Sequence, residues 1–263
     1  MSGSRARRIG LLAAGLTVAS GAQGWAVTFE TMNGAPVQMQ PYVDEPGAPT
    51  VTVPLGTTQP FVGSSGSTSL GGGSGSSGSS EALTTLYGTS WGAIAAANAM
   101  SVNVNPSALA SVCVAETTTC NSSASNGSFT GAFQMGSAAF HDGLNAALAA
   151  NPALASQIVS GSGGISDPTT QAIAASGYIL LGNTALQNSG IASPTALDFR
   201  SFHNFGPTYG VSVAQSPPTA LMSEVLPSSW LQQNGITQSE TVGAWRASVA
   251  SKIGTATNQT LIN

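Results

Sequence analysis

Beyond about residue 82 the apolar residues of the chain are spaced as they are in helices. The stretch 87–102 is rich in Ala and contains no Pro, which favours a helix. The next apolar stretch begins with Asn105, a good N-cap, followed by Pro106 in the first helical position. These signals predict two successive helices.

Further helical stretches follow, each with a start or a stop signal. Their limits are a break at Asn151-Pro152, a helix from Ser166 or Asp167 to Gly190, and a helix from Ser193 to Gly206-Pro207. In the tail, an apolar residue recurs every four positions, which favours a helix that completes the core over one that docks a partner. These apolar residues are Trp245, Val249 and Ile253. The predicted fold class is mainly α.

The chain begins with Arg5, Arg7 and Arg8, followed by an apolar stretch and then small residues. This order is typical of a secretory signal peptide, and we expect cleavage after Ala22 or Ala26. An uncleaved membrane anchor would need about 20 continuous apolar residues, and polar residues interrupt this run too early. No later run is apolar enough to span a bilayer, so we expect a periplasmic or secreted protein.

Composition divides the chain into five segments. A signal peptide at 1–26 precedes a Pro-, Thr- and Val-rich segment at 27–62, which could be extended or contain a short strand or two. Residues 63–81 consist mostly of Gly and Ser and should form a flexible linker. The predicted helical domain spans 82–212, and 213–263 form a helical extension.

Charged residues make up only 6% of the chain, where about 25% is usual. Without the signal peptide, three basic residues stand against ten acidic ones, so the net charge becomes −7 and nucleic acid is a poor candidate partner. Export makes a disulfide between the two cysteines plausible. Two histidines, His141 and His203, and two such cysteines do not make an ordinary zinc site. Serines are abundant throughout the chain, so picking one of them as a nucleophile would be arbitrary.

Glu116 stands alone at the end of an apolar run, between Cys113 and Cys120. An unbroken helix would separate the two cysteine Cα atoms by about 10 Å, beyond the roughly 7 Å that a disulfide allows. If the cysteines pair, the helix must therefore end between them, and Glu116 lies near its C-terminus. The helix dipole and apolar neighbours would both raise the pKa of Glu116, which suits a proton donor.

Four motifs occur in one order: NPSALASVCVAE, GAFQM, DPTTQAIAASGYILLGN and FHNFGP. Together they resemble the lysozyme-like, SLT-type lytic transglycosylases of peptidoglycan, in which a helix ending in Glu-Ser precedes Gly-Leu-Met-Gln and later Ala-Tyr-Asn-Ala-Gly. The resemblance covers about residues 85–212. It implies a lysozyme-like helical fold.

The resemblance also assigns roles to residues. Glu116 matches the catalytic acid/base, and Gln134 and Asn204 match side chains that line the sugar-binding cleft. Gly131 would permit a close backbone approach at the start of its segment. The apolar pair Phe133 and Met135 would form the floor of the groove.

Two residues depart from the family pattern. Thr117 replaces the serine after the glutamate and keeps its hydroxyl. His203 replaces the tyrosine before the asparagine, and a protonated imidazole beside Glu116 would favour the ionised carboxylate. A buried histidine satisfied by the backbone is an equally weighted alternative.

The implied reaction cleaves the MurNAc-GlcNAc β-1,4 bond and closes a 1,6-anhydro ring, with Glu116 as acid and then as base and with no metal or organic cofactor. Peptidoglycan strands would be the partner, and an envelope-spanning secretion apparatus is a further candidate. One alternative is a muramidase that recruits water through Asp142, Asp167 or Asp198. Another is a non-catalytic module that binds glycan or serves secretion.

Overall fold

The structure is a computed structural model that describes residues 15–21, 24–30, 36–38, 52–54, 80–127 and 129–263. The chain divides into two compact units, Met1–Gly75 and Ser76–Asn263. The predicted Gly/Ser linker lies almost wholly outside the described residues. Among these, no helix is long and apolar enough to cross a membrane.

The first unit contains a four-stranded antiparallel sheet in the order β3-β2-β1-β4. Its strands are β1 (Gly15–Gly21), β2 (Gly24–Glu30), β3 (Pro36–Gln38) and β4 (Thr52–Pro54). Thr17 of β1 pairs with Thr28 of β2 and with Thr52 of β4. β1 lies inside the segment predicted as a signal peptide, whose cleavage stays a prediction.

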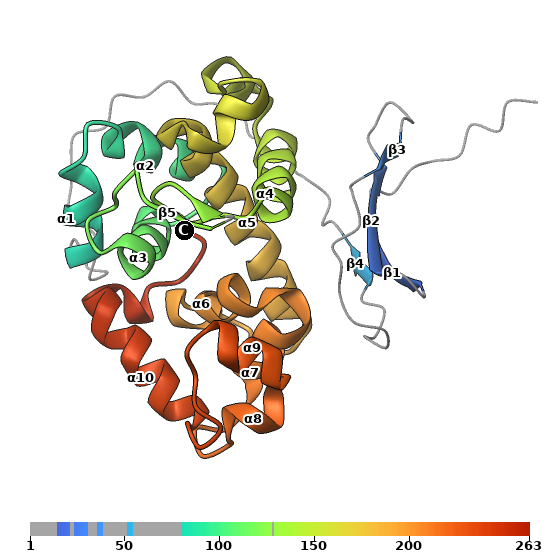
Figure 1. Ribbon diagram of the computed structural model, residues 1–263. Helices are drawn as coiled ribbons and strands as arrows, with labels where there is room; N and C mark the ends of the chain where they lie inside the picture. The colour runs from blue at the N-terminus through green and yellow to red at the C-terminus, as the bar shows by residue number, and fades with distance from the viewer. Residues whose placement is uncertain (1–14, 22–23, 31–35, 39–51, 55–79, 128) are drawn as a thin grey trace, which may run out of the picture. The chain divides into compact units, whose positions relative to one another are not determined.

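The second unit is mainly helical (Figure 1). Its α-helices are α1 (Glu81–Tyr87), α2 (Gly92–Ser101), α3 (Pro106–Thr117), α4 (Ser137–Ala150), α5 (Pro168–Asn188), α6 (Ala196–Phe205), α7 (Val211–Gln215), α8 (Met222–Val225), α9 (Ser228–Gln233) and α10 (Val242–Ile253). Short 3-10 helices are η1 (Pro152–Gln157), η2 (Gly161–Ser166) and η4 (Gly254–Asn258), and η3 (Gly206–Gly210) is a π-helical turn. A small hairpin joins β5 (Ser125–Asn126) to β6 (Phe129–Thr130).

The helix starts follow from local side-chain caps. Asn105 accepts a hydrogen bond from the Ser107 N–H at the start of α3, and Asp167 caps α5, as the sequence predicts. The predicted start of α6 at Ser193 is wrong. Thr195 is the N-cap there, because its hydroxyl and the Asp198 carboxylate form a reciprocal capping box.

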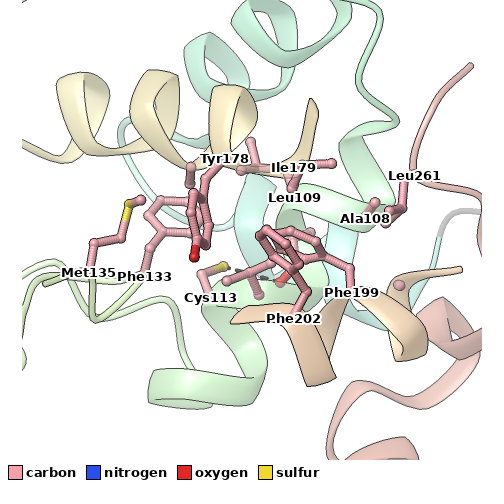
Figure 2. Close-up of a cluster of buried hydrophobic side chains, with 14 of the residues drawn as sticks. Ala108, Leu109, Cys113, Phe133, Met135, Tyr178, Ile179, Phe199, Phe202 and Leu261 are labelled. Atoms are coloured by element: carbon pink, nitrogen blue, oxygen red, sulfur yellow. Dashed lines mark hydrogen bonds between the residues drawn. The ribbon is translucent and has the colours of Figure 1, made fainter. Parts of the chain in front are cut away.

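One hydrophobic core joins the helices of the second unit (Figure 2). α4 and α5 pack closely because Gly143 lies against the Ala174 backbone and Gly177 lies against the Gly143 backbone, where a Cβ atom would overlap. Phe199 and Phe202 of α6 stack on one another and meet the ring of Tyr178 from α5.

The C-terminal helix completes this core. Trp245, Val249 and Ile253 are buried, which confirms the prediction for the tail. α10 contacts both α3 and α6, so the C-terminal segment lies beside the two helices that carry the site described next (Figure 1). Arg246 of α10 strengthens this junction through an ion pair of 2.7 Å with Asp198 of α6.

Candidate active site

The end of α3 positions Glu116. The helix stops at Thr117, and Thr118 has a positive φ of 59° that turns the chain away. Cys113 and Cys120 form a disulfide across this end, with Cα atoms 4.8 Å apart. The structure confirms both the pairing and the helix end that the pairing requires.

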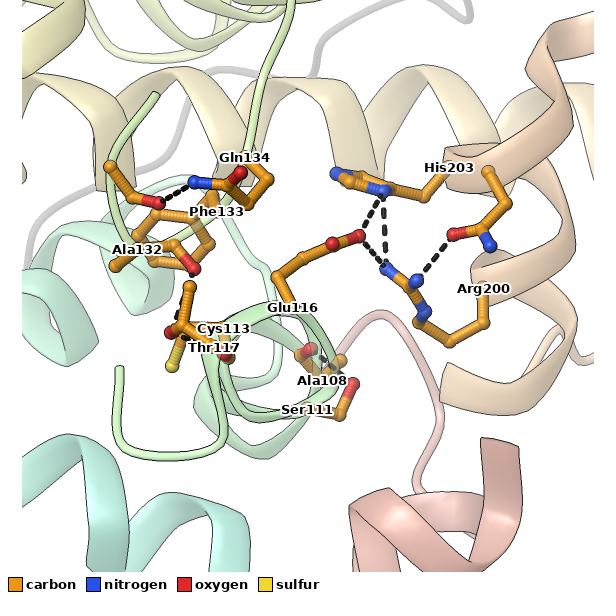
Figure 3. Close-up of polar contacts among 12 residues, drawn as sticks. Ala108, Ser111, Cys113, Glu116, Thr117, Ala132, Phe133, Gln134, Arg200 and His203 are labelled. Atoms are coloured by element: carbon orange, nitrogen blue, oxygen red, sulfur yellow. Dashed lines mark hydrogen bonds and ion pairs between the residues drawn. The ribbon is translucent and has the colours of Figure 1, made fainter. Parts of the chain in front are cut away.

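Two basic side chains of α6 meet the carboxylate of Glu116 (Figure 3). Arg200 Nη1 lies 2.8 Å from Glu116 Oε1, and His203 Nδ1 lies 3.2 Å from the same oxygen. The Glu116 side chain is 20% exposed, whereas those of Arg200 and His203 are 5% and 7% exposed. The carboxylate is therefore the accessible member of a largely buried cluster.

This cluster overturns the prediction that the pKa of Glu116 is raised. Burial does raise the pKa of this carboxyl, but the charge of Arg200 and the contacts with His203 outweigh burial and lower it to about 2. The prediction failed because Arg200, distant in sequence, was not placed beside the carboxylate. Glu116 is thus ionised at neutral pH in this conformation.

His203 links the carboxylate to the neighbouring loop. Burial lowers the pKa of the imidazole, and the charge of Arg200 lowers it further, against opposing hydrogen bonds with Glu116 and with the Phe133 backbone. Nδ1 also lies 3.1 Å from Arg200 Nη1. His203 therefore contacts the carboxylate and the backbone of a second motif at once, rather than the backbone alone.

Asn204 completes the polar face of α6, because its Oδ1 accepts a hydrogen bond from Arg200 Nη2. Arg200, His203 and Asn204 share one side of the helix, since residues spaced by three and four positions are neighbours there. The role of Arg200 was missed by the sequence analysis. The signal available in the sequence was that Arg200 precedes His203 and Asn204 of the FHNFGP motif by three and four positions, the spacing of neighbours on one helix face.

The segment after the small hairpin approaches the site from the other side (Figure 3). Gly131 has a φ of 75°, and a Cβ atom would overlap the buried Gln171 amide, so this position allows a close approach within the fold, while its role at a substrate site stays a prediction. Gln171 holds this segment by donating to the Thr130 carbonyl (2.6 Å) and accepting from the Phe133 N–H (3.1 Å). Partly buried Gln134, with a φ of 44°, donates to the Gly131 carbonyl at 2.7 Å.

Phe133, Met135 and Thr117 make contacts within the fold itself. Phe133 and Met135 are fully buried, with Phe133 packed edge-on against Trp91, so they belong to the core and do not form the floor of a groove. Thr117 donates to the Cys113 carbonyl at 3.0 Å and accepts from the Asn121 N–H at 3.0 Å. Its hydroxyl ties the loop after α3 to the helix.

The three aspartates considered for a water-activating role differ in their surroundings. Asp167 accepts from the backbone and the hydroxyl of Thr170 as the cap of α5. Asp198 is engaged by its capping box and by Arg246. Burial raises the pKa of Asp142 on α4 to about 6.

A polar cavity of about 210 Å³ adjoins the cluster. Ala115, Arg200 and Asn204 form the side nearest the candidate site, and residues 234–236 and α10 form the opposite side. No group of three metal-binding side chains occurs among the described residues. Comparison with known proteins finds no matching family model, no matching curated protein and no matching solved structure.

Proposed function

We propose that the helical unit is a peptidoglycan lytic transglycosylase of lysozyme-like fold, with Glu116 as its acid and base. One observation carries the proposal: the partly exposed carboxylate ends α3 and faces the FHNFGP motif of α6 in an otherwise buried cluster. This brings together the residues that the sequence resemblance selects. The loop bearing Gln134 reaches the cluster through the contact of its Phe133 backbone with His203.

In the proposed reaction the protonated Glu116 gives its proton to the bridging oxygen, and the bond from that oxygen to the muramic C1 breaks. The N-acetyl group of the substrate stabilises the positive charge at C1. The Glu116 carboxylate then removes the proton from the C6 hydroxyl, whose oxygen bonds to C1. Water is not consumed, and the carboxyl returns to its protonated form.

The ion pair with Arg200 opposes the first step. A carboxyl with a pKa of about 2 is protonated in only roughly one molecule in a thousand at pH 5. We therefore infer that the structure shows a resting state, and that Arg200 leaves Glu116 before proton transfer. His203 can stay, because a neutral imidazole accepts a hydrogen bond from a protonated carboxyl.

The test is mass spectrometry of purified peptidoglycan digested by the protein and by Glu116→Gln. We expect fragments with 1,6-anhydro ends from the former and none from the variant. Reducing ends that depend on Glu116 would instead identify a muramidase. That outcome requires a second carboxylate to hold the water, and two of the three candidates already serve as helix caps.

A second candidate function is a glycan-binding module without catalysis, and the same ion pair favours it. Arg200 and Glu116 neutralise one another, as they would in a purely structural pair. Binding of intact glycan strands in a pull-down assay, with no product released by either protein, would support this module against the enzyme. A secretion apparatus stays a candidate partner for both functions.

A further inference from the structure

The cavity beside Arg200 is built largely by the part of the chain that lies beyond the resemblance. Asn234, Glu240, Trp245 and Lys252 line it, and all four follow residue 212. Sites for drug-sized ligands measure about 300–1,000 Å³. At about 210 Å³ this cavity suits a single sugar-sized molecule.

Two cationic groups of the cavity have hydrogen-bonding capacity to spare. Lys252 is exposed and belongs to none of the ion pairs in the described part of the chain. Arg200 Nε is buried and, among the described residues, has no hydrogen-bond partner. A buried N–H without a partner is costly, so a small turn of the guanidinium toward an acceptor in the cavity would be favourable.

The other lining residues complement these cations. Glu240 and Asn234 provide acceptors and an amide donor for hydroxyl groups. Trp245 and Val249 provide an apolar wall. A ligand that matches all of them has a carboxylate, several hydroxyls and an apolar face.

We propose that this cavity binds an organic carboxylate bearing hydroxyl groups, such as an acidic sugar or a small hydroxy acid, held by Lys252 and Arg200. The bound carboxylate competes with Glu116 for the Arg200 guanidinium. This second step rests on the proposed function, because it makes the ligand a device that frees the catalytic carboxyl. Binding itself does not depend on catalysis.

Calorimetric titration of the full chain tests the site, using N-acetylmuramic acid, N-acetylglucosamine and lactate as probes. The two sugars differ by the lactyl ether with its carboxylate, so we expect N-acetylmuramic acid to bind at least roughly tenfold more tightly, as loss of one charge-assisted contact implies. Lactate binding as tightly as the acidic sugar would identify a free hydroxy acid as the ligand. Lactate binding much more weakly would identify the sugar.

Variants of the cavity wall locate the binding. Lys252→Gln should weaken binding roughly tenfold, whereas Lys252→Arg should retain it and Glu240→Gln should strengthen it, since each changes one charge facing the ligand. Circular dichroism melts of each variant show that it is folded. An affinity that is unchanged in Lys252→Gln, or equal affinity for both sugars, would overturn the proposal. Neither result bears on anhydro products, so failure of this site and failure of the proposed function are distinguishable.

Discussion

His203 Nδ1 lies within hydrogen-bonding reach of two partners that make opposite demands on it. A protonated Nδ1 donates to Glu116 but faces the Arg200 N–H groups, and a bare Nδ1 accepts from Arg200 but faces an ionised carboxylate. Nδ1 can therefore satisfy only one of these two partners at a time. The two groups therefore titrate as a coupled pair, and Arg200 sets the balance between them.

Removing the Arg200 guanidinium should raise the pKa of Glu116. In Arg200→Gln we expect the pKa of Glu116 to rise well above its value of about 2, because burial then acts with only His203 opposing it. Carbon-13 NMR titration of the glutamate carboxyls, assigned through Glu116→Gln, measures this. Arg246→Gln, which breaks the ion pair between Arg246 and Asp198, is the control and should leave the pKa of Glu116 near 2. A pKa unchanged in Arg200→Gln would show that Arg200 does not control the acid.

The lowered pKa of Glu116 also predicts how stability varies with pH. The folded value of about 2 lies below the ordinary 4.5, so the contribution to the free energy of unfolding is complete above pH 4.5 and is lost as pH falls to 2. The full change should be about 3 kcal/mol. Denaturant unfolding of the protein and of Glu116→Gln, compared from pH 6 to pH 2, measures the difference. A difference that is constant from pH 6 to pH 2 would contradict the lowered pKa.

At the scale of elements, the loop from Thr117 to Met135 is held at several points by covalent and polar contacts. The disulfide joins its start to α3, and Gln171 of α5 anchors its end. The disulfide could be expected from export, and helix geometry then predicted that α3 ends between Cys113 and Cys120. The anchor could not, because a glutamine within α5 gives no sign of which distant carbonyl it meets.

Substitutions at Gly127 and Gly131 distinguish the cost of a steric clash from the cost of backbone strain. Gly131→Ala places a methyl group against Gln171 at a φ of 75°, whereas Gly127→Ala meets nothing within 4 Å at a φ of 62°. We expect Gly127→Ala to cost about 1 kcal/mol of unfolding free energy from strain alone, and Gly131→Ala at least about 2 kcal/mol more. Urea unfolding of the two variants measures the difference. Equal losses of unfolding free energy in the two variants would show that the Gln171 side chain moves aside without an energetic cost.

The α6 face shows where prediction from sequence stops. The caps of α3 and α5 are local signals, and both were read correctly. The meeting of Glu116 with Arg200 joins residues 84 positions apart, and it depends on how α3 and α6 pack. Local propensity predicts each helix but not how the two helices pack. The direction of the Glu116 pKa shift therefore could not be predicted.

At the scale of the whole molecule, four of the few charged residues in the described part of the chain form two ion pairs at the junction of α3, α6 and α10, Glu116–Arg200 and Asp198–Arg246. The onset of helix near residue 81 and the core-completing role of α10 followed from composition and apolar spacing. The cavity did not, because its wall combines α3, α6 and α10, which only the tertiary arrangement brings together. Solubility must come from hydroxyls and amides instead of salt bridges.

Because Arg200 is buried and both arginines are held in ion pairs, cleavage by trypsin can measure local opening of the fold. The chain has no Lys or Arg between Arg8 and Arg200, and Arg200 and Arg246 are held in ion pairs while Lys252 is exposed. Trypsin should therefore cut the folded protein first after Lys252, and after Arg200 only when α6 opens. Intact-mass analysis of a timed digest would follow both events. Early cleavage after Arg200 would contradict a closed α6, whereas slow cleavage would make the rate of proteolysis a measure of how often the cluster of Glu116, Arg200 and His203 opens.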